Sequence, residues 1–537
     1  MMYRRFLTFV AAAVTAVSLL TPSSLAAAPR FSVDSVRAAP EQPKKPKKRT
    51  TSRKRASPAS RRAATRASAA HAAANSPALG WTRPRGASAL NSDLASILSR
   101  KEDGKWGAMV VSLTRGDTLF ALAPDEPKMP ASTMKMFTSV LALDRLGPNW
   151  QFSTDVLRDG AVGADGTLQG NLYLRGDGDP ALSKRWVPGP GLDAPMQELA
   201  DKVAAAGIRH VKGDLVADAS AFESRTIPEG WLSRYAGSGY AAPFSALSLN
   251  ENIVVVAVYP DGSVKLEPAT TGITVQDQVK VTGGGGSSLH IYRSSDGSVV
   301  ARGSIGRSAG VRRLQLTVAD PPMFTGGALR AALASKGITV DGQLKTGTTP
   351  AAASLVASHK SPPLSELLAA MNRESINHFA ELIFRNAVRG PKRDSLGTAE
   401  KGNALLQHFM TTKAGAPPNA ISVTDGCGLS VLDHVTPRSM IDMLSYAHRA
   451  PWGSAFHASL PVAGESELLR NRMKYTPAQG NLHAKTGTTN DVIGLGGYVT
   501  AEDGEVLAFS FLFNGHDRWN ARATIDRMGA TMAAFSR

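Results

Sequence analysis

A serine and a lysine stand three residues apart in the segment PASTMK, at Ser132 and Lys135. If a helix begins here, the two side chains lie on one face, one turn apart. A serine hydroxyl is a weak nucleophile until a base takes its proton, and a lysine acts as such a base when burial or a nearby cation lowers its pKa. The pair therefore predicts nucleophilic catalysis. The alternative is an N-terminal helix serine followed by a solvated lysine.

Ser375 and Asn377 form a second polar pair, just before a predicted helix at 378–388. On a tight turn, a hydroxyl and an amide two residues apart can enter one pocket. Ser375 would then relay a proton, and Asn377 would donate to a substrate amide carbonyl. The alternative is that Ser375 only caps the N-terminus of the helix.

The pentapeptide KTGTT occurs twice. Its second copy begins at Lys485 and runs toward an apolar segment that we expect to be a strand, so it is predicted to lie on a sheet edge. There Thr486 would bind a carboxylate, and Gly487 would let a ligand backbone approach closely. The Thr488 N–H would join the Ser132 N–H in an oxyanion hole.

The first copy of the pentapeptide begins at Lys345, at the end of a β-rich region. It runs into Pro350, which lacks the N–H that a strand ladder needs. We therefore interpret Lys345 as a surface lysine outside any active site.

The elements that must position these residues can be recognised from apolar spacing. Apolar runs at 106–113 and 118–123 flank a four-residue turn and predict a β-hairpin, and Met134 to Leu143 suits a buried helix that closes near Gly147. Further helices are predicted at Leu364–Met371, His378–Val388, Pro437–Arg449 and Ala521–Phe535, and strands at Val492–Thr500 and Val506–Phe513. The first and last hairpins would complete one antiparallel sheet, which makes the middle of the chain an insertion.

That middle, from about Phe152 to Ala357, has a different pattern. Short apolar segments such as Asn171–Leu174, Ile253–Val258 and Leu314–Val318 are separated by turns rich in Gly and Asp. This pattern predicts one or two β-rich modules.

The start of the chain indicates an exported protein, and the length of 537 residues suits two or three domains. Arg4 and Arg5 precede an apolar run at 6–20, and small residues at 26–28 offer a cleavage site. No later stretch is long and apolar enough to span a bilayer. The single cysteine, Cys427, cannot form an internal disulfide. We expect a periplasmic or otherwise extracytoplasmic location.

The formal net charge of +17 would suit nucleic-acid binding, but it is concentrated in one segment. Residues 30–86 contain 15 Lys or Arg against two acidic residues, and Arg4 and Arg5 add +2, so the chain after Gly86 carries only +2. No nucleic-acid partner is therefore expected. The basic segment is rich in Pro, Ala and Ser and is expected to be disordered. It is either a solvated spacer or an electrostatic contact to anionic envelope components.

Three motifs follow one another in the chain: S-x-x-K, then S-x-N, then K-T-G, a set known in penicillin-binding proteins and class A β-lactamases. With them the chain resembles the low-molecular-mass D-alanyl-D-alanine carboxypeptidase/endopeptidase family (penicillin-binding protein 4 type, class C). The resemblance covers about residues 95–537. It rests on PASTMK, GNLYLRGDGDPALS, YAAPFSALSLNEN, MNRESINHFAE, TDGCGLS, SLPVAG and AKTGTTNDVIGLGGYV.

The resemblance implies an α/β (α+β) fold with a penicillin-binding transpeptidase/β-lactamase-like domain, in which helices flank an antiparallel sheet. An inserted β-rich domain, carrying a nested third domain, would interrupt it. The expected limits are a signal peptide at 1–28, a disordered basic linker at 29–90, a catalytic domain at 91–155 and 358–537, and the inserted domains at 156–357.

The resemblance also implies the chemistry. Ser132 would be acylated, with Lys135 as its base. Ser375, Asn377 and Lys485 would complete the catalytic network, and Thr486 would bind the terminal D-Ala carboxylate. The substrates would be peptidoglycan stem peptides, with cross-links as further substrates of a DD-endopeptidase activity, and β-lactam antibiotics would be inhibitors. No metal or cofactor is expected.

One departure puts side-chain selectivity in doubt, because Val431 stands where the family often has an arginine suited to a free carboxylate. Cys427 is interpreted as a small packed residue. Two other functions remain open at this point. A β-lactamase has no evident use for the large insertion, and a non-catalytic envelope-binding protein would act through the basic segment alone.

Overall fold

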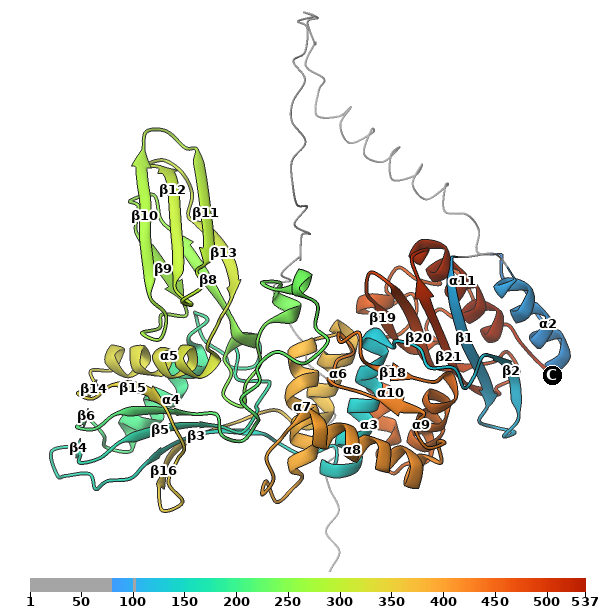
Figure 1. Cartoon of the computed structure of the whole chain (residues 1–537), viewed down its shortest axis with the longest axis horizontal. Coiled ribbons are helices and arrows are strands. Elements are labelled where there is room, and N and C mark those ends of the chain that lie inside the picture. Colours follow the sequence, from blue (N-terminus) through green and yellow to red (C-terminus); the bar gives the residue numbers. More distant parts are fainter. Residues whose placement is uncertain (1–79, 100–102) are drawn as a thin grey trace, which may run out of the picture. The chain divides into compact units, whose positions relative to one another are not determined.

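One antiparallel sheet joins the two ends of the described chain (Figure 1), and its strands follow the order β19-β20-β21-β1-β2. They are β1 (Gly104–Ser112), β2 (Thr118–Leu122), β19 (His483–Thr488), β20 (Val492–Thr500) and β21 (Val506–Gly515). Strand β1 pairs with β21 along its whole length, from Gly104 opposite Gly515 to Ser112 opposite Leu507. The prediction that the first and last hairpins form one sheet is therefore confirmed.

The computed structural model describes residues 80–99 and 103–537. The predicted signal peptide and most of the predicted basic linker lie outside the described residues. Helix α2 (Ala87–Leu98) begins before residue 90, and Gly86 N–H donates to the carbonyl of Ser536 over 2.8 Å. Residues 86–90, which were expected to be linker, therefore belong to the folded part, because they begin helix α2 and pair with the C-terminal segment.

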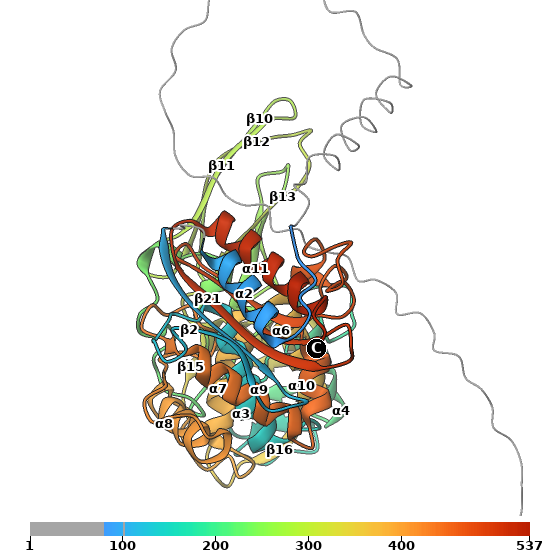
Figure 2. The ribbon, with the colours of Figure 1, turned by 90° about the vertical axis from the view of Figure 1, so that its right-hand side faces the viewer.

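Helices cover both faces of this sheet. Helices α2 and α11 (Arg518–Ala533) pack on one face (Figure 2). The helices of the other face share a second core, which contains α3 (Met134–Leu146), α6 (Leu364–Glu374), α7 (Asn377–Arg389), α8 (Ala399–Phe409), α9 (Pro437–Arg449) and α10 (Gly453–Ser459). Along β21, Phe509 and Phe511 point to the first core and Ala508 and Leu512 to the second. Because side chains alternate along a strand, this sheet separates two apolar layers.

Helix α3 lies inside the second core. All of its side chains from Met134 to Leu143 are buried, including that of Lys135. It ends at Gly147, which adopts a φ of 80°. A helix that is buried on every side has few alternative positions, so it holds its first turn firmly.

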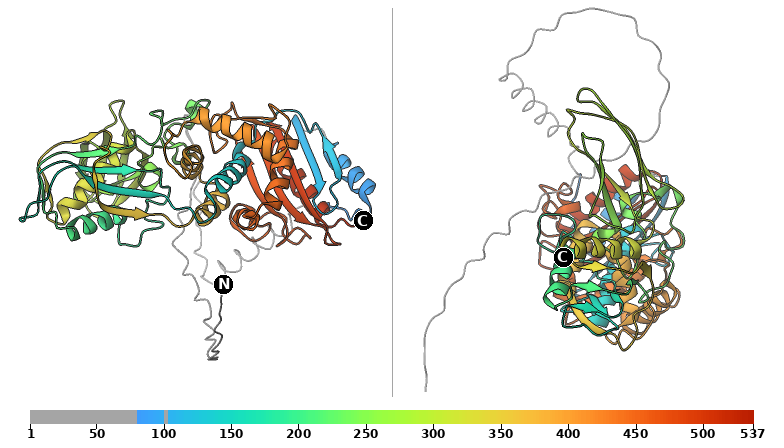
Figure 3. Two further views of the ribbon diagram at one scale, coloured as in Figure 1. Left: turned by 90° about the horizontal axis from the view of Figure 1, so that it is seen from below. Right: turned by 90° about the vertical axis from the view of Figure 1, so that its left-hand side faces the viewer.

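The inserted part leaves and returns through two paired strands, β3 (Ser153–Arg158) and β16 (Ser354–Lys360) (Figure 3). They belong to a five-stranded mixed sheet of order β15-β7-β5-β3-β16. Its other strands are β5 (Leu172–Gly176), β7 (Leu215–Asp218) and β15 (Leu344–Thr346), and a small sheet adds β4 (Thr167–Leu168), β6 (His210–Val211) and β14 (Thr339–Val340). The expected limits at 156 and 357 cut through both paired strands, so we propose limits near 153 and 360.

Two helices, α4 (Ala194–Ala205) and α5 (Pro321–Ser335), also belong to the inserted part. These two helices were not predicted from the sequence. Helix α5 contains Gly326 and Gly327, which weaken the helical signal. A Cβ on Gly327 would come within 2.2 Å of the backbone nitrogen of Gly272. The glycine is therefore required by the close approach of a neighbouring loop.

A nested pair of three-stranded sheets lies between residues 253 and 317. One has the order β13-β8-β9 and the other β10-β12-β11. Their strands are β8 (Ile253–Val258), β9 (Val264–Glu267), β10 (Val275–Thr282), β11 (Ser287–Arg293), β12 (Val299–Gly306) and β13 (Arg312–Thr317). A small core that includes Val258, Ile305 and Ala309 holds the two sheets together.

The remaining elements are short. They are the 3-10 turns η1 (Ala131–Thr133), η2 (Ser233–Tyr235), η3 (Gly239–Ala241), η4 (Asn250–Asn252) and η6 (Glu467–Leu469), the π turn η5 (Met410–Ala414), and the strands β17 (Ile421–Ser422) and β18 (His434–Val435). Within residues 80–99 and 103–537, no helix has the length and apolar character needed to cross a membrane.

Candidate active site

Ser132 lies in η1, the single turn that leads into α3. The hydroxyl and the backbone N–H of Thr133 both donate to the carbonyl of Pro130, over 2.7 and 3.3 Å. Ala131 adopts a φ of 45°, which is strained for a residue with a side chain. These contacts fix the turn that presents the Ser132 hydroxyl.

Lys135, in the first turn of α3, is fully buried and reaches three oxygen atoms. Its Nζ lies 3.0 Å from Ser132 Oγ, 2.7 Å from Asn377 Oδ1 and 2.9 Å from the Cys427 carbonyl. The amide and carbonyl oxygens can only accept hydrogen bonds. When Lys135 is neutral, its two N–H bonds therefore point at those acceptors, and its lone pair points at Ser132, the one partner that can give a proton.

Burial, and not the neighbouring charges, favours that neutral form. Burial lowers the pKa of Lys135 below the ordinary lysine value, although the nearby Cys427, Asp425 and Glu381 oppose this shift. A lysine with a lowered pKa serves as a general base near neutral pH.

Ser375 and Asn377 lie on the junction between α6 and α7. Ser375 ends α6 in the left-handed region, with φ 60° and ψ 44°, and Ile376 is the N-cap residue of α7. The alternative that Ser375 caps the N-terminus of α7 is therefore excluded. The Asn377 amide accepts from Lys135 through Oδ1 and donates through Nδ2 to the Tyr240 carbonyl over 2.8 Å.

Lys485 lies in β19, the edge strand of the central sheet, as expected. It is fully buried, and its Nζ donates to Ser375 Oγ over 3.0 Å and to the Thr486 carbonyl over 2.9 Å. Burial, and then the charge of Lys135, hold the pKa of Lys485 well below its usual range. The structure thus joins Ser132 and Lys135 of the first segment to Ser375, Asn377 and Lys485 of the last.

Gly487 has a role that differs from the expected one. A Cβ at this position would lie 2.6 Å from the carbonyl oxygen of Pro130 and 3.3 Å from the Ala131 side chain. The space beside Gly487 is therefore filled by the turn that carries Ser132, and the glycine lets β19 approach η1. Thr486 is buried next to it, whereas Thr488 is exposed.

We expect Gly487→Ala to lower the rate of Ser132 acylation by about 100-fold, because β19 must move away from η1 and reacting groups then lose their alignment. The rate would be measured by mass spectrometry of the intact protein during reaction with penicillin. Gly283→Ala, at an exposed position with open space around the glycine, is the control and should leave the rate unchanged. Equal rates for Gly487→Ala and the unmodified protein would contradict the close approach.

The first KTGTT copy lies elsewhere. Lys345 is in β15 of the inserted sheet, its side chain is 54% exposed, and its Nζ lies 2.5 Å from Asp214. The interpretation of Lys345 as a surface lysine is confirmed.

Several residues around the site were not foreseen as functional. The loop 424–430 supplies the Cys427 carbonyl, while the Cys427 side chain is buried, as expected. The inserted part supplies Trp231, whose indole N–H donates to Asp425 over 2.8 Å, and Tyr240, which is 53% exposed. Val431 N–H donates to the Gly230 carbonyl. Sequence spacing gives no signal for such contacts, since most of them use backbone groups.

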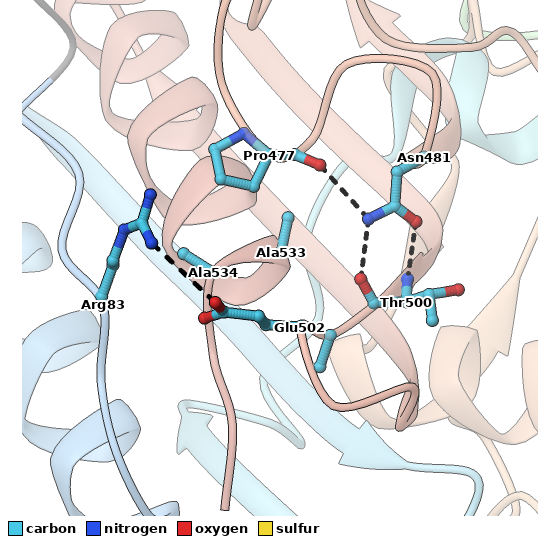
Figure 4. Close-up of a pocket in the computed structure, with 8 residues that line it drawn as sticks. Arg83, Pro477, Asn481, Thr500, Glu502, Ala533 and Ala534 are labelled. Atoms are coloured by element: carbon cyan, nitrogen blue, oxygen red, sulfur yellow. Dashed lines mark hydrogen bonds and ion pairs between the residues drawn. The ribbon is translucent and has the colours of Figure 1, made fainter.

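A cavity of about 260 Å³ lies away from these residues (Figure 4). Arg83 and Glu502 lie across it, and Asn481 exchanges two hydrogen bonds with the backbone of Thr500. The side chains of Arg83, Asn481 and Glu502 thus already have partners within the protein, and none of the residues that reach Lys135 or Lys485 lines the cavity.

The family profile and the two relatives described next all concern D-Ala-D-Ala carboxypeptidases. A profile of the D-Ala-D-Ala carboxypeptidase 3 (S13) family matches residues 90–535. A D-alanyl-D-alanine carboxypeptidase of Actinomadura sp. (strain R39) is 34% identical over 486 residues, which cover 86% of this chain and 87% of the relative. The D-alanyl-D-alanine carboxypeptidase DacB of Haemophilus influenzae is 28% identical over 423 residues, which cover 76% of this chain and 85% of the relative.

A solved structure shares the fold. The crystal structure of penicillin binding protein 4 (dacB) from Haemophilus influenzae aligns with a TM-score of 0.69 and 23% identity, over 82% of this chain and 98% of that chain. A second structure of that protein, complexed with a novel β-lactam, aligns with a TM-score of 0.64, over 81% of this chain and 97% of that chain. The mixed fold with helices around a sheet is therefore the one expected.

Proposed function

This chain belongs to the D-Ala-D-Ala carboxypeptidase 3 (S13) family, and from this premise we propose how its buried lysines and serines hydrolyse a D-Ala-D-Ala bond. The enzyme is a serine-type D-Ala-D-Ala carboxypeptidase that acts on peptidoglycan stem peptides. The observation that supports the mechanism best is the set of three oxygen atoms around Lys135 Nζ, of which only Ser132 Oγ can donate a proton.

In the first step, neutral Lys135 takes the proton of Ser132 as Oγ bonds to the carbonyl carbon of the penultimate D-Ala. The negative charge that develops on the carbonyl oxygen is stabilised by the N–H groups of Ser132 and Thr488. Thr486 binds the carboxylate of the terminal D-Ala, and the negative charge of that carboxylate raises the pKa of the neighbouring Lys485 and keeps this lysine protonated. The substrate would thereby lie along the edge of β19.

In the second step, the peptide C–N bond breaks. The departing nitrogen takes a proton from Ser375 Oγ, and Ser375 regains one from Lys485 Nζ, 3.0 Å away. D-Ala leaves, and an ester to Ser132 remains, with Lys135 protonated and Lys485 neutral. The low pKa of Lys485, caused by burial and by the charge of Lys135, favours this donation.

Water then hydrolyses the ester. One proton of the water molecule passes to the neutral amine of Lys485. Ser132 Oγ regains a proton from Lys135 as the acyl group leaves. Both lysines return to their starting states, so the cycle is balanced. A β-lactam would form the same ester through its ring carbonyl and would inhibit the enzyme as long as water cannot remove it.

The location of the enzyme follows from this substrate. Stem peptides are found outside the cytoplasmic membrane, so an extracytoplasmic enzyme, exported by the signal at residues 1–28, is proposed. The contact of the basic segment with anionic envelope components stays a prediction, as does DD-endopeptidase activity on cross-links.

Mass spectrometry of defined muropeptides tests this function. We expect a monomeric pentapeptide to lose one D-Ala and a tetrapeptide to remain intact, with Ser132→Ala enzyme as the inactive control. The same measurement on cross-linked dimers decides whether cross-links are also cleaved. If the pentapeptide stayed intact while penicillin was rapidly turned over, a β-lactamase would replace the proposed function, and no reaction with either would favour the non-catalytic alternative.

A further inference from the structure

The loop 424–430 folds around one buried carboxylate, that of Asp425. Its Oδ1 accepts the N–H groups of Cys427 and Gly428, over 2.9 and 2.5 Å. Its Oδ2 accepts those of Leu429 and Ser430, over 3.1 and 2.8 Å. Trp231 Nε1, from the inserted part, is a fifth donor at 2.8 Å. None of the catalytic roles proposed above accounts for a fully buried carboxylate that accepts hydrogen bonds from five N–H groups.

This loop packs closely against η1, the turn that carries Ser132. Gly428 adopts a φ of 81°, and a Cβ there would lie 1.8 Å from the Ala131 carbonyl oxygen. On its other side, a Cβ on Gly426 would lie 2.5 Å from Phe384 of α7. The loop therefore lies in close backbone contact with the residue next to Ser132, and the Cys427 carbonyl at its centre is the one that accepts from Lys135.

A second buried carboxylate holds the loop from α7. Glu381 accepts the Gly426 N–H over 2.9 Å and pairs with Arg385 over 2.8 Å. Arg385 also pairs with Glu223 of the inserted part, 3.1 Å away, and lies 4.0 Å from the centre of the Phe244 ring. Both carboxylates thus connect the loop to the inserted part.

The cluster of Glu381, Asp425 and Cys427 has donor types that bind metals, and the three lie close together. The oxygens of Asp425 are, however, occupied by the five N–H groups, and both oxygens of Glu381 are also paired. The cluster therefore serves to hold the backbone and is not a metal site.

We propose that Asp425 is a positioning residue for Lys135: it shapes the loop so that the Cys427 carbonyl directs the lone pair of Lys135 at Ser132, and Trp231 of the inserted part acts on Lys135 through Asp425. This inference rests on the proposed role of Lys135 as the base. It assigns a catalytic purpose to the inserted part, which anchors one of the three contacts of the base.

The charge state of this carboxylate is set by its neighbours. Burial would raise the pKa of Asp425, but hydrogen bonds from Asp433, from the loop N–H groups and from Trp231 outweigh burial and lower it. Burial and the charge of Asp425 raise the pKa of Asp433 well above its usual range, so Asp433 is the protonated partner. Because Asp425 is charged and Asp433 is protonated, replacing each of them by asparagine gives a matched pair of variants.

The experiment compares Asp425→Asn with Asp433→Asn by the second-order rate of acylation with fluorescent penicillin between pH 5 and 10. An amide at 433 keeps the donor that the protonated carboxyl supplies, so this variant should react like the unmodified enzyme. An amide at 425 loses acceptors for the loop, and we expect acylation to fall by about 100-fold.

The pH profile separates positioning from mere loss of structure. The charged or titratable groups around Lys135 are Glu381 on α7, Asp425 and Cys427 in the loop, and Lys485 on β19. Removing the negative charge of Asp425 disfavours the Lys135 ammonium, so the acid limb of the profile should move to lower pH in Asp425→Asn. Two outcomes for Asp425→Asn would overturn the proposal. One is slower acylation with the acid limb of the pH profile unshifted, and the other is an unchanged rate of acylation.

Trp231→Phe tests the link to the inserted part. It removes the indole N–H donor and part of a ring that packs against the core, so about fivefold slower acylation is expected together with a small decrease in melting temperature. In the double variant with Asp425→Asn, no further loss should occur, since both changes act through one group. Additive losses would overturn the link, and should Asp425→Asn not fold, an unchanged rate in Trp231→Phe would overturn it as well. Failure of the unmodified enzyme to react with penicillin would instead contradict the proposed function.

Discussion

Ser132→Ala is expected to abolish both covalent labelling by fluorescent penicillin and release of D-Ala from a pentapeptide, a loss of at least about 10⁴-fold. The hydroxyl is the only partner of Lys135 that can transfer a proton, and no other group within residues 80–99 and 103–537 takes its place beside Lys135. Gel fluorescence and intact-protein mass spectrometry measure the label, and chromatography of the released amino acid measures turnover.

Ser308→Ala is a suitable control for this experiment, because Ser308 is an exposed serine of the nested sheets. It should label at the rate of the unmodified enzyme. The melting temperature of Ser132→Ala should stay within a few degrees of that enzyme, since the change removes one oxygen atom from a partly exposed residue. A labelled Ser132→Ala enzyme would show that another residue is acylated.

Lys485→Ala is expected to slow acylation by at least about 10³-fold, whereas Lys345→Ala should leave it unchanged. The two lysines begin identical pentapeptides, so local sequence is the same in both variants. Lys485 is buried and donates to Ser375, while Lys345 makes an exposed ion pair with Asp214 in another sheet. The second-order rate constant for penicillin acylation is the measurement.

This pair of variants carries its own control, because both remove one lysine from a strand. Lys485→Arg adds a further distinction: it restores the charge but not the compact amine, and its bulk does not fit a fully buried position. It should therefore remain far below the activity of the unmodified enzyme. Equal losses in Lys485→Ala and Lys345→Ala would mean that the active site had been assigned to the wrong copy.

The elements predicted correctly from the sequence are those in which side-chain type and apolar periodicity carry the information. Val492–Thr500 and Pro437–Arg449 were predicted with the bounds that the structure has. The sheet between the two ends followed from placing one hairpin at each end. The burial of α3 also followed from its sequence, because apolar residues occupy more than one face of that helix.

Other features left little trace in the sequence because backbone geometry decides them. The Cys427 carbonyl touches Lys135, yet any residue has a carbonyl, so the side-chain type at 427 does not reveal the contact. Asp425 binds backbone N–H groups, which every residue except proline possesses. Trp231 and Tyr240 reach the site from the inserted part, whose placement depends on long-range packing.

Gly487 illustrates a partly correct prediction. A close approach at this glycine was expected, because the missing Cβ leaves space. The sequence did not say what enters that space, and the structure shows the turn around Pro130 there. In α5, by contrast, the glycines masked a helix, since their low helix propensity outweighed the apolar residues around them.

The pairing of β1 with β21 has a consequence for how the enzyme comes into being. During synthesis or export, β1 and Ser132 emerge long before β19 and β21, with the whole inserted part between them. Contacts between such distant positions form slowly, because a long stretch of chain must first be brought together. Until then Ser132 lacks Lys485, so the nascent chain is inactive. The unpaired edge of β1 is meanwhile open to pairing with other strands, which makes the incomplete chain prone to aggregation.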